Sequence, residues 1–453
     1  KVHRAVVNFL TTMGRVPGMS EQDVLVAVTT LSFDIHVLEI YLPLIIGAKV
    51  VIASREVASD GTQLLETLTN SNATVMQATP STWRLLLAAD WKGSDRLKIL
   101  CGGEVFPRDL VKELISRAAS VWNMYGPTET TVWSTCYKLK NPDDPVLIGK
   151  PIGNTTCYIL DKRMQPVPIG VPGELHIGGD GVTRGYLKRP NLTAKQFVSD
   201  RFSGDPEARI YKTGDLVRYR PDGNIEYLNR IDNQVKVRGF RIELGEIETV
   251  MTEHDAVAQG IVTVKEARPG DARLIAFVVT LPGHDLTVTE LRRHLRGRLP
   301  EYMIPNHMVE IDALPLTPAG KIDRKGMPAP FSIGGDGEDE YVAPSTESEV
   351  FLAKMWQEVL GTDRVSVHDN FFDIGGHSLL SMQVLARIKK ETGLQLSPRV
   401  MLLNTLGQIA EEYPLKLPSA EPGPSEDQEN FPQGFFGQRI MRKIKDRFQR
   451  PSK

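Results

Sequence analysis

The stretch Asp369-Asn-Phe-Phe-Asp-Ile-Gly-Gly-His-Ser-Leu-Leu380 places one hydroxyl nucleophile, Ser378, after two glycines and ahead of an amphipathic run. Leu380, Val384 and Ile388 share one face of the helix that this spacing predicts, so Ser378 lies at or just before its first turn. Unpaired backbone N–H groups at a helix start favour anions, which suits a phosphate ester on the serine. An ordinary N-cap would explain the serine, but not the Phe-Phe and Gly-Gly-His around it.

The composition of the whole chain is that of a globular protein. Its 453 residues suggest about three domains. Lys and Arg number 54 against 56 Asp and Glu, and the formal net charge of −2 indicates neither a nucleic-acid nor a membrane partner. No apolar run is long enough to span a membrane and the first residues lack a signal-peptide pattern, so we expect a cytoplasmic protein. Cys101, Cys136 and Cys157 have no CxxC spacing, which argues against a disulfide framework and a cysteine-bound zinc.

Upstream of this stretch, short β-rich runs alternate with helical segments. The expected strands are residues 24–28, 49–53, 73–76, 97–100 and 121–124, and the expected helices are residues 4–10, 36–46 and 63–69, one after Pro80 and one with Pro107 at its first position. This alternation predicts a mostly parallel sheet covered on both faces, with ligands at the carboxyl ends of its strands. Glycine-rich turns stand at two of those ends, in Cys101-Gly-Gly-Glu104 and Tyr125-Gly-Pro-Thr-Glu-Thr-Thr131. Short β runs separated by turns follow between Gly173 and Asp232.

Several longer motifs carry a family resemblance. They are Tyr125-Gly-Pro-Thr-Glu129, Gly173-Glu-Leu, Tyr211-Lys-Thr-Gly-Asp215, Arg230-Ile-Asp-Asn-Gln-Val-Lys-Val-Arg-Gly-Phe-Arg-Ile-Glu243 and Pro318-Ala-Gly-Lys321. Their order resembles that of adenylation domains in nonribosomal peptide synthetases, which belong to the adenylate-forming superfamily. The segment around Ser378 resembles the phosphopantetheine attachment site of the carrier domains of the same enzymes. Many motifs in one order argue strongly against a chance match.

The resemblance implies a multidomain fold. The parts it implies are an α/β large subdomain with a β-rich portion at 1–230 that lacks its N-terminal part, an α+β small mobile subdomain at 231–330, a linker at 331–342, a four-helix-bundle carrier domain at 343–415, and a linker leading into a following region at 416–453. Within the small subdomain we expect strands at 234–241, 260–264 and 273–280, and helices that begin near Glu246 and Thr289. The basic end of the tail suits either a membrane- or partner-binding helix or, as we favour, the start of a further domain.

In this family an amino acid and ATP form an aminoacyl adenylate, so the site needs cations and N–H donors around the phosphates. Lys321 matches the catalytic lysine, Thr128 the α-phosphate contact and Glu129 the Mg²⁺ ligand. Asp215 and Arg230 match the residues that hold the ribose, and Tyr227 would pack beside adenine. The other implied ATP or AMP contacts are Gly103, Asn123, Tyr125 and Gly126. Without the motifs, Lys321 would be read as an exposed lysine, Asp215 as a turn residue and Arg230 as half of a surface ion pair.

The resemblance also assigns the pocket that selects the amino acid. Asp34 matches the acid that pairs with the α-ammonium, because a cation removed from water needs a charged partner; alone, Asp34 would read equally well as a helix cap. The other pocket positions are Ile35, Leu38, Gln77, Leu100, Gly102, Met124, Val132 and Trp133. All but Gly102 are large or branched, which leaves little room for a side chain. We therefore expect glycine as the substrate, with alanine next, since one methyl group changes binding by only about 1 kcal/mol.

The second half-reaction in the family moves the acyl group to the thiol of 4′-phosphopantetheine. The small subdomain would rotate about Asp232, withdraw Lys321 and bring Gly239 to the pantetheine tunnel. The implied partners are the amino acid, a phosphopantetheinyl transferase that modifies Ser378, and neighbouring condensation, reductase or thioesterase domains. The Ser/Thr/Gly phosphate loop of the family has its expected place just before Lys1, so we expect the chain to be part of a longer polypeptide.

Two other functions stay open from the residues. The chain could be a carrier scaffold beside an inactive adenylation remnant. It could also activate a fatty or aryl acid, although Asp34 argues against this because its carboxylate would then be buried without a cation.

Overall fold

The computed structural model describes residues 1–232, 234–237, 240–266, 272–284, 286–305, 307–315, 322–324, 326–327, 341–372, 374–376, 378–396, 400–401 and 404–414. Among the predicted features, Lys321, Gly239, most of the 331–342 linker and the tail 416–453 lie outside these residues. In the part of the chain that is described, no helix is long and apolar enough to cross a membrane.

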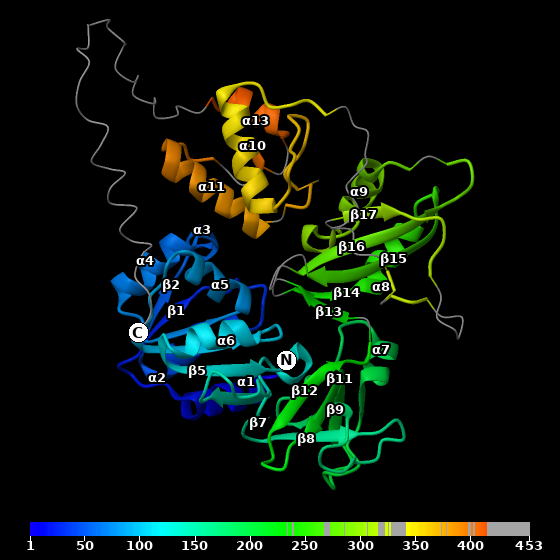
Figure 1. Ribbon diagram of the computed structural model, residues 1–453. Coiled ribbons are helices and arrows are strands. Elements are labelled where there is room, and N and C mark those ends of the chain that lie inside the picture. Colours follow the sequence, from blue (N-terminus) through cyan, green and yellow to red (C-terminus); the bar gives the residue numbers. More distant parts are fainter. Residues whose placement is uncertain are drawn as a thin grey trace, which may run out of the picture.

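The N-terminal part is built on a seven-stranded sheet in the order β2-β1-β3-β4-β5-β6-β7. The parallel strands are β1 (Val24–Ala27), β2 (Lys49–Ile52), β3 (Val75–Ala78), β4 (Ser94–Gly102) and β5 (Ala118–Tyr125), and the antiparallel edge is β6 (Thr135–Leu139) and β7 (Lys150–Pro151). The predicted parallel α/β sheet is confirmed, with strand ends shifted by a few residues. Figure 1 shows the blue and cyan helices on both sides of this sheet.

The helices of this part are divided between the two faces. They are α1 (His3–Met13), η1 (Gly14–Gly18), α2 (His36–Ile46), α3 (Arg55–Ser59), α4 (Gly61–Ser71), α5 (Pro80–Ala88), α6 (Arg108–Ile115) and η2 (Thr128–Thr130). Val26 on β1 packs in a cluster with α4, α5 and α6, whereas its neighbour Leu25 packs in a cluster with α1 and α2. This is the alternation of faces that a strand covered on both sides requires. Pro107 is the N-cap of α6 instead of its predicted first residue.

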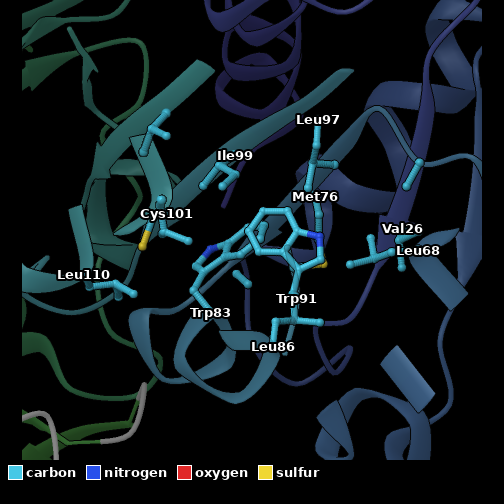
Figure 2. Packing of buried hydrophobic residues seen from close by; sticks show 14 of the residues in the cluster. Val26, Leu68, Met76, Trp83, Leu86, Trp91, Leu97, Ile99, Cys101 and Leu110 are labelled. Atoms are coloured by element: carbon cyan, nitrogen blue, oxygen red, sulfur yellow. The ribbon is translucent and has the colours of Figure 1, made fainter. Parts of the chain in front are cut away.

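One of the two clusters is built around a pair of tryptophans (Figure 2). The rings of Trp83 on α5 and Trp91 lie 6.0 Å apart in a tilted arrangement, a geometry that aromatic pairs favour. Met76 and Ile99 from the sheet pack against them. This cluster anchors the strands whose carboxyl ends form the site.

The β-rich portion forms a second sheet in the order β10-β11-β9-β8, with β12 paired to β11. Its elements are β8 (Thr155–Leu160), β9 (Gly173–Gly179), α7 (Pro190–Gln196), β10 (Phe197–Ser199), β11 (Arg209–Tyr219) and β12 (Ile225–Arg230). Asp215 on β11 pairs directly with Arg230 on β12. The sheet register therefore brings together two residues that the sequence analysis assigned to one ligand.

The predicted α+β small subdomain contains a hairpin and a three-stranded sheet. Its elements are β13 (Gln234–Val237), β14 (Phe240–Glu243), α8 (Leu244–Thr252), β15 (Val257–Glu266), β16 (Ala272–Thr280), α9 (Val288–Arg296), η3 (Glu301–Met303) and β17 (His307–Glu310). The single strand predicted over 234–241 is wrong, because Val237 pairs with Phe240 and the chain reverses between them. The uninterrupted β-rich pattern over 234–241 concealed the boundary between these two paired strands.

The carrier domain is helical, as predicted. The helices α10 (Glu347–Leu360), α11 (Ser378–Thr392) and α13 (Leu406–Glu412) share one buried cluster, in which the rings of Trp356 and Phe371 meet edge to face at 5.1 Å. Thr346 closes a capping box at the start of α10. Ser378 is the first residue of α11, the position that the sequence pattern predicts. Figure 1 shows these yellow and orange helices as a separate unit.

Candidate active site

A cleft with about 560 Å³ of empty space opens at the carboxyl ends of β4 and β5. Three parts of the chain line it. The sheet and its loops contribute Phe33, Asp34, Ile35, Gly103, Tyr125, Gly126, Pro127, Thr128 and Trp133, the β-rich portion contributes Thr213, Asp215 and Arg230, and the β13–β14 hairpin contributes Gln234, Lys236 and Arg241. This is the edge of the sheet where the strand order predicted a ligand.

The Asp215 carboxylate is buried and held from two sides. Tyr125 donates its hydroxyl to Oδ2 at 2.5 Å, and Arg230 donates Nη1 to Oδ1 at 2.9 Å. Burial is the largest influence and raises the pKa of Asp215, although Arg230 opposes the rise. The residue before Asp215 is Gly214, which has a φ of 72°. A Cβ at this position would lie 2.5 Å from a carboxylate oxygen of Asp232, so only glycine fits beside Asp232.

Arg230 also connects the cleft to the predicted hinge residue. Its Nε and Nη2 each donate to Asp232 at 2.6 Å, and Nη2 donates to the Thr213 carbonyl at 3.0 Å. The bidentate pair fixes the plane of the guanidinium. Arg230 is thus part of a network and not the isolated surface ion pair that the residue type alone would suggest.

Glu129 is buried and fully engaged by side chains. Arg241 donates Nη1 to both of its oxygens at 3.0 and 2.8 Å, and the Tyr186 hydroxyl donates to Oε1 at 2.6 Å. Burial alone would raise the pKa of Glu129, but Arg241 and Tyr186 outweigh it and lower the pKa. The carboxylate is therefore ionised and bound to a cation that comes from the small subdomain.

A magnesium ion fits Glu129 by its donor chemistry, with a condition. Mg²⁺ commonly takes one or two protein carboxylates together with substrate phosphates. Within the described residues there is no group of three or more His, Cys, Asp or Glu side chains that could hold a metal by themselves. Since Arg241 already donates to both oxygens of Glu129, a metal at Glu129 would compete with the guanidinium for this carboxylate.

The hairpin brings a second cation into the cleft. The Nζ atom of Lys236 lies 5.9 Å from the centre of the Tyr125 ring, on the side of the cleft that holds Asp215. Burial is the main cause that lowers the pKa of Lys236, and the Asp215 charge opposes that fall. Lys236 and Arg241 stand at directly paired positions, so both cations project from one face of the hairpin.

Asp34 does not cap the helix that follows it. The N-cap of α2 is Ile35, and no side chain accepts a capping hydrogen bond from the backbone at this helix start. The cap interpretation is therefore wrong. The Asp34 carboxylate instead accepts a hydrogen bond from the Lys1 ammonium, and both side chains are largely buried. A primary ammonium is the partner that the sequence analysis expected for this acid, although here a lysine supplies it.

The remaining predicted pocket positions are packed against one another. Ile35, Leu38, Leu100, Met124, Val132 and Trp133 belong to a single buried cluster. Trp133 donates its indole N–H to Oε1 of the buried Gln77 at 2.7 Å. A Cβ at Gly102 would lie 2.8 Å from the far edge of the Trp133 ring, so the indole rests directly on the glycine backbone. Thr131 and Val132 precede it with φ of 67° and 70°, a left-handed conformation that a branched residue adopts only where the surroundings enforce it.

The structure brings most of the predicted ATP contacts together, but not all of them. Gly103, Tyr125, Gly126, Thr128, Asp215 and Arg230 line the cleft. Asn123 instead donates Nδ2 to the Leu147 carbonyl at 2.8 Å, and Tyr227 packs on the β-rich core; neither is among the lining residues. Lys321 and Gly239 lie outside the described residues, as does the Ser378 side chain, so their roles stay predictions.

The sequence analysis missed Arg241, Lys236, Tyr186 and Glu39. Alternation within the hairpin could have indicated the first two, because Val235 and Ile242 face the core while polar residues take the other face. Glu39 is a charged residue in an otherwise apolar helix, which signals a buried partner. Tyr186 reaches Glu129 across 57 positions of sequence, and no local pattern reports such a contact.

Comparison with known proteins finds matches to three family models along the chain. Family models match for an AMP-binding enzyme at residues 2–187, an AMP-binding enzyme C-terminal domain at 246–321 and a phosphopantetheine attachment site at 350–412. A dimodular nonribosomal peptide synthase of Bacillus subtilis (strain 168) is 47% identical over 87% of the chain, and tyrocidine synthase 3 of Brevibacillus parabrevis is 40% identical over 86%. The chain spans only 16% and 6% of the length of these two relatives.

Two solved structures resemble the chain. A holo four-domain nonribosomal peptide synthetase bound to AMP and glycine is 39% identical with a TM-score of 0.50, covering 91% of this chain and 31% of that one. A holo synthetase protein with adenylation and carrier domains, bound to a vinylsulfonamide inhibitor, is 27% identical with a TM-score of 0.70, covering 87% of this chain and 66% of that one. The chain therefore belongs to the adenylate-forming enzymes of nonribosomal peptide synthesis, with adenylation-domain sequence followed by a phosphopantetheine carrier domain.

Proposed function

We propose that this adenylation and carrier pair activates glycine, with alanine as the next best substrate, and loads it onto the arm attached to Ser378. The observation that carries the choice of glycine is the packing of Trp133 on the backbone of Gly102. The indole stands where a larger amino acid would place its side chain, and close-packed neighbours leave it no room to withdraw. The similar four-domain synthetase bound to AMP and glycine supports the same substrate.

The residues around the cleft fit the requirements of adenylation. Adenylation domains use ATP and Mg²⁺, and the metal, when bound, neutralises charge on the phosphates. In our proposal Asp34 pairs with the substrate ammonium. Asp215, which Tyr125 and Arg230 hold in place, accepts hydrogen bonds from the ribose hydroxyls. Thr128 and Gly126 border the space between these two ends of the cleft. Lys321 would supply the catalytic cation, as its motif implies.

The position of the β13–β14 hairpin supports a second arrangement of the small subdomain, one used for transfer of the amino acid to the carrier. Lys236 and Arg241 stand inside the cleft, and Arg241 holds the carboxylate that would otherwise be available to a metal. The hairpin position seen here therefore disfavours a metal at Glu129, because two cations would share one carboxylate. We infer that the small subdomain, turning at Asp232, alternates between an adenylation and a transfer arrangement, and that the arrangement described here is the one that receives the carrier arm. A phosphopantetheinyl transferase and neighbouring synthetase domains are the partners this proposal requires.

Amino-acid-dependent exchange of labelled pyrophosphate into ATP tests the proposal. The longest natural polypeptide that contains this chain should exchange fastest with glycine, and alanine should follow by about 5-fold or more, since one methyl group is worth about 1 kcal/mol or slightly more. Reactions with each larger amino acid and with none are the controls.

Two results of this assay would contradict the proposal at different points. Absence of exchange with every amino acid would favour a carrier scaffold beside an inactive remnant. Equal exchange with glycine and phenylalanine would leave the enzyme intact but refute the closed pocket.

A further inference from the structure

Glu39 has a buried carboxylate behind Trp133, and it is not one of the predicted pocket residues. Glu39 on α2 is completely buried. Its Oε2 accepts the backbone N–H groups of Val28 and Thr29, both at 2.9 Å. Its Oε1 accepts the Thr29 hydroxyl at 2.5 Å and the Gln77 amide at 2.8 Å. Both oxygens are thus used, and burial, which raises the pKa of Glu39, is opposed by all of these hydrogen bonds.

The network has a fixed direction from donor to acceptor. Oε1 of Glu39 accepts the hydrogen bond from Gln77, so Gln77 turns its NH₂ group toward Glu39. The same nitrogen donates to the Ile35 carbonyl at 2.9 Å. The amide oxygen of Gln77 then points the other way, where it accepts the Trp133 indole N–H at 2.7 Å. Glu39 and the Ile35 carbonyl, both acceptors, therefore hold the Gln77 amide in the orientation that presents its oxygen to the indole N–H.

We propose that Glu39 is a positioning residue for substrate selection: its carboxylate orients Gln77, Gln77 holds the indole of Trp133 on Gly102, and the indole closes the pocket to side chains. Glu39 is completely buried and does not line the cleft, so it would act on the pocket through Gln77 and Trp133. This inference rests on the proposed activation of a small amino acid and names the device that enforces it.

The network predicts that glutamine, which is neutral and has the same shape as glutamate, cannot replace Glu39 in this role. In Glu39→Gln one carboxylate oxygen becomes an NH₂ group, which faces either the two backbone N–H groups or the Gln77 amide. Both arrangements set a donor against a donor in a site without water access. If Gln77 turns over to relieve the conflict, its NH₂ meets the indole N–H and Trp133 loses its partner.

The test compares selectivity, expressed as the ratio of kcat/KM for glycine to that for alanine and for valine in pyrophosphate exchange. Glu39→Gln should lower both ratios by about 5-fold or more, the consequence of one buried donor left unpaired. Trp133→Phe, which removes the indole N–H together with part of the ring that rests on Gly102, should shift the ratios in the same direction. The exchange of Glu39→Gln with Gln77→Glu returns an acceptor to Trp133 and should restore part of the selectivity, a rescue that a general loss of stability would not give.

A matched carboxylate at the other end of β1 provides the control. Asp23 accepts the Ser20 N–H and the Thr74 hydroxyl, each at 2.7 Å, on the side of the sheet away from the cleft. Asp23→Asn should lower stability and leave both ratios unchanged. If Glu39→Gln does not fold, Glu39→Asp replaces it, because the shorter side chain keeps the charge but cannot reach the backbone N–H groups and Gln77 together.

The outcomes separate this inference from the proposed function. If the unmodified protein does not prefer glycine, the proposed substrate is wrong, and the profile of the Glu39 variants must still move toward larger side chains for the inference to hold. If a folded Glu39 variant keeps the substrate profile of the unmodified protein, Glu39 is a structural residue and the inference is overturned. The same conclusion follows if the glycine rate falls in proportion to all others.

Discussion

At the scale of single residues, Asp34 shows how the structure can narrow the roles that a sequence leaves open. The sequence allowed Asp34 to be a helix cap or a ligand for an ammonium. The structure removes the cap, because the helix begins without it, and shows the carboxylate facing an ammonium at the wall of the cleft. The proposed amine-binding role is consistent with this position.

Replacing this acid should damage recognition of the amine and little else. In Asp34→Ala, kcat/KM for glycine in pyrophosphate exchange should fall by about 100-fold, because a desolvated ammonium loses its charged partner. Acetate, which is glycine without the amino group, should lose no rate. Asp143→Ala, which breaks an exposed ion pair with Lys112, is the control and should change neither substrate. A parallel loss with glycine and acetate would assign Asp34 to the fold instead.

At the scale of elements, we propose that the position of the β13–β14 hairpin selects between the two half-reactions. Its paired strands place Lys236 and Arg241 on one face, and Arg241 joins Glu129 across 112 positions of sequence. The pair is more than a surface ion pair, because Glu129 is almost completely buried. The element thus competes with a metal for one carboxylate.

Removing that competition should separate the two half-reactions. Arg241→Gln should reduce the single-turnover transfer of glycine to the carrier by about 10-fold, since a partly buried ion pair that stabilises the transfer arrangement is lost. Pyrophosphate exchange should stay constant or rise, because Glu129 is released. The control is Arg218→Gln, which breaks an exposed pair with Glu226 and should affect neither rate. Equal losses in both assays would mean that Arg241 only supports the fold.

The same hairpin marks the boundary of what the sequence could predict. Hydrophobic alternation and turn residues predicted the parallel sheet, its helices and Ser378 at a helix start, since these patterns are local. The β-rich pattern from Gln234 to Arg241 predicts one strand, whereas the structure has two paired strands in this region. The Arg241–Glu129 pair and the bonds from Glu39 through Gln77 to Trp133 join distant segments, so only the folded chain shows them.

At the scale of the whole molecule, the carrier domain lies against the small subdomain. A Cβ placed on Gly375 would lie 3.1 Å from His307 and 3.2 Å from Arg273, which belong to β17 and β16. Gly375 stands three positions before Ser378, so the attachment segment faces the subdomain that also carries the hairpin. The two mobile elements of the proposed cycle are therefore in contact in this arrangement.

The central claim is that the cleft loads glycine onto Ser378, and the most direct measurement is mass spectrometry of the peptide that contains Ser378. The phosphopantetheinylated protein, incubated with ATP, Mg²⁺ and an equimolar mixture of amino acids, should carry glycine on this peptide in excess over every other amino acid. Ser378→Ala should carry none while its glycine-dependent pyrophosphate exchange continues. A different amino acid in excess on Ser378, or glycine attached to the protein in Ser378→Ala, would contradict the account.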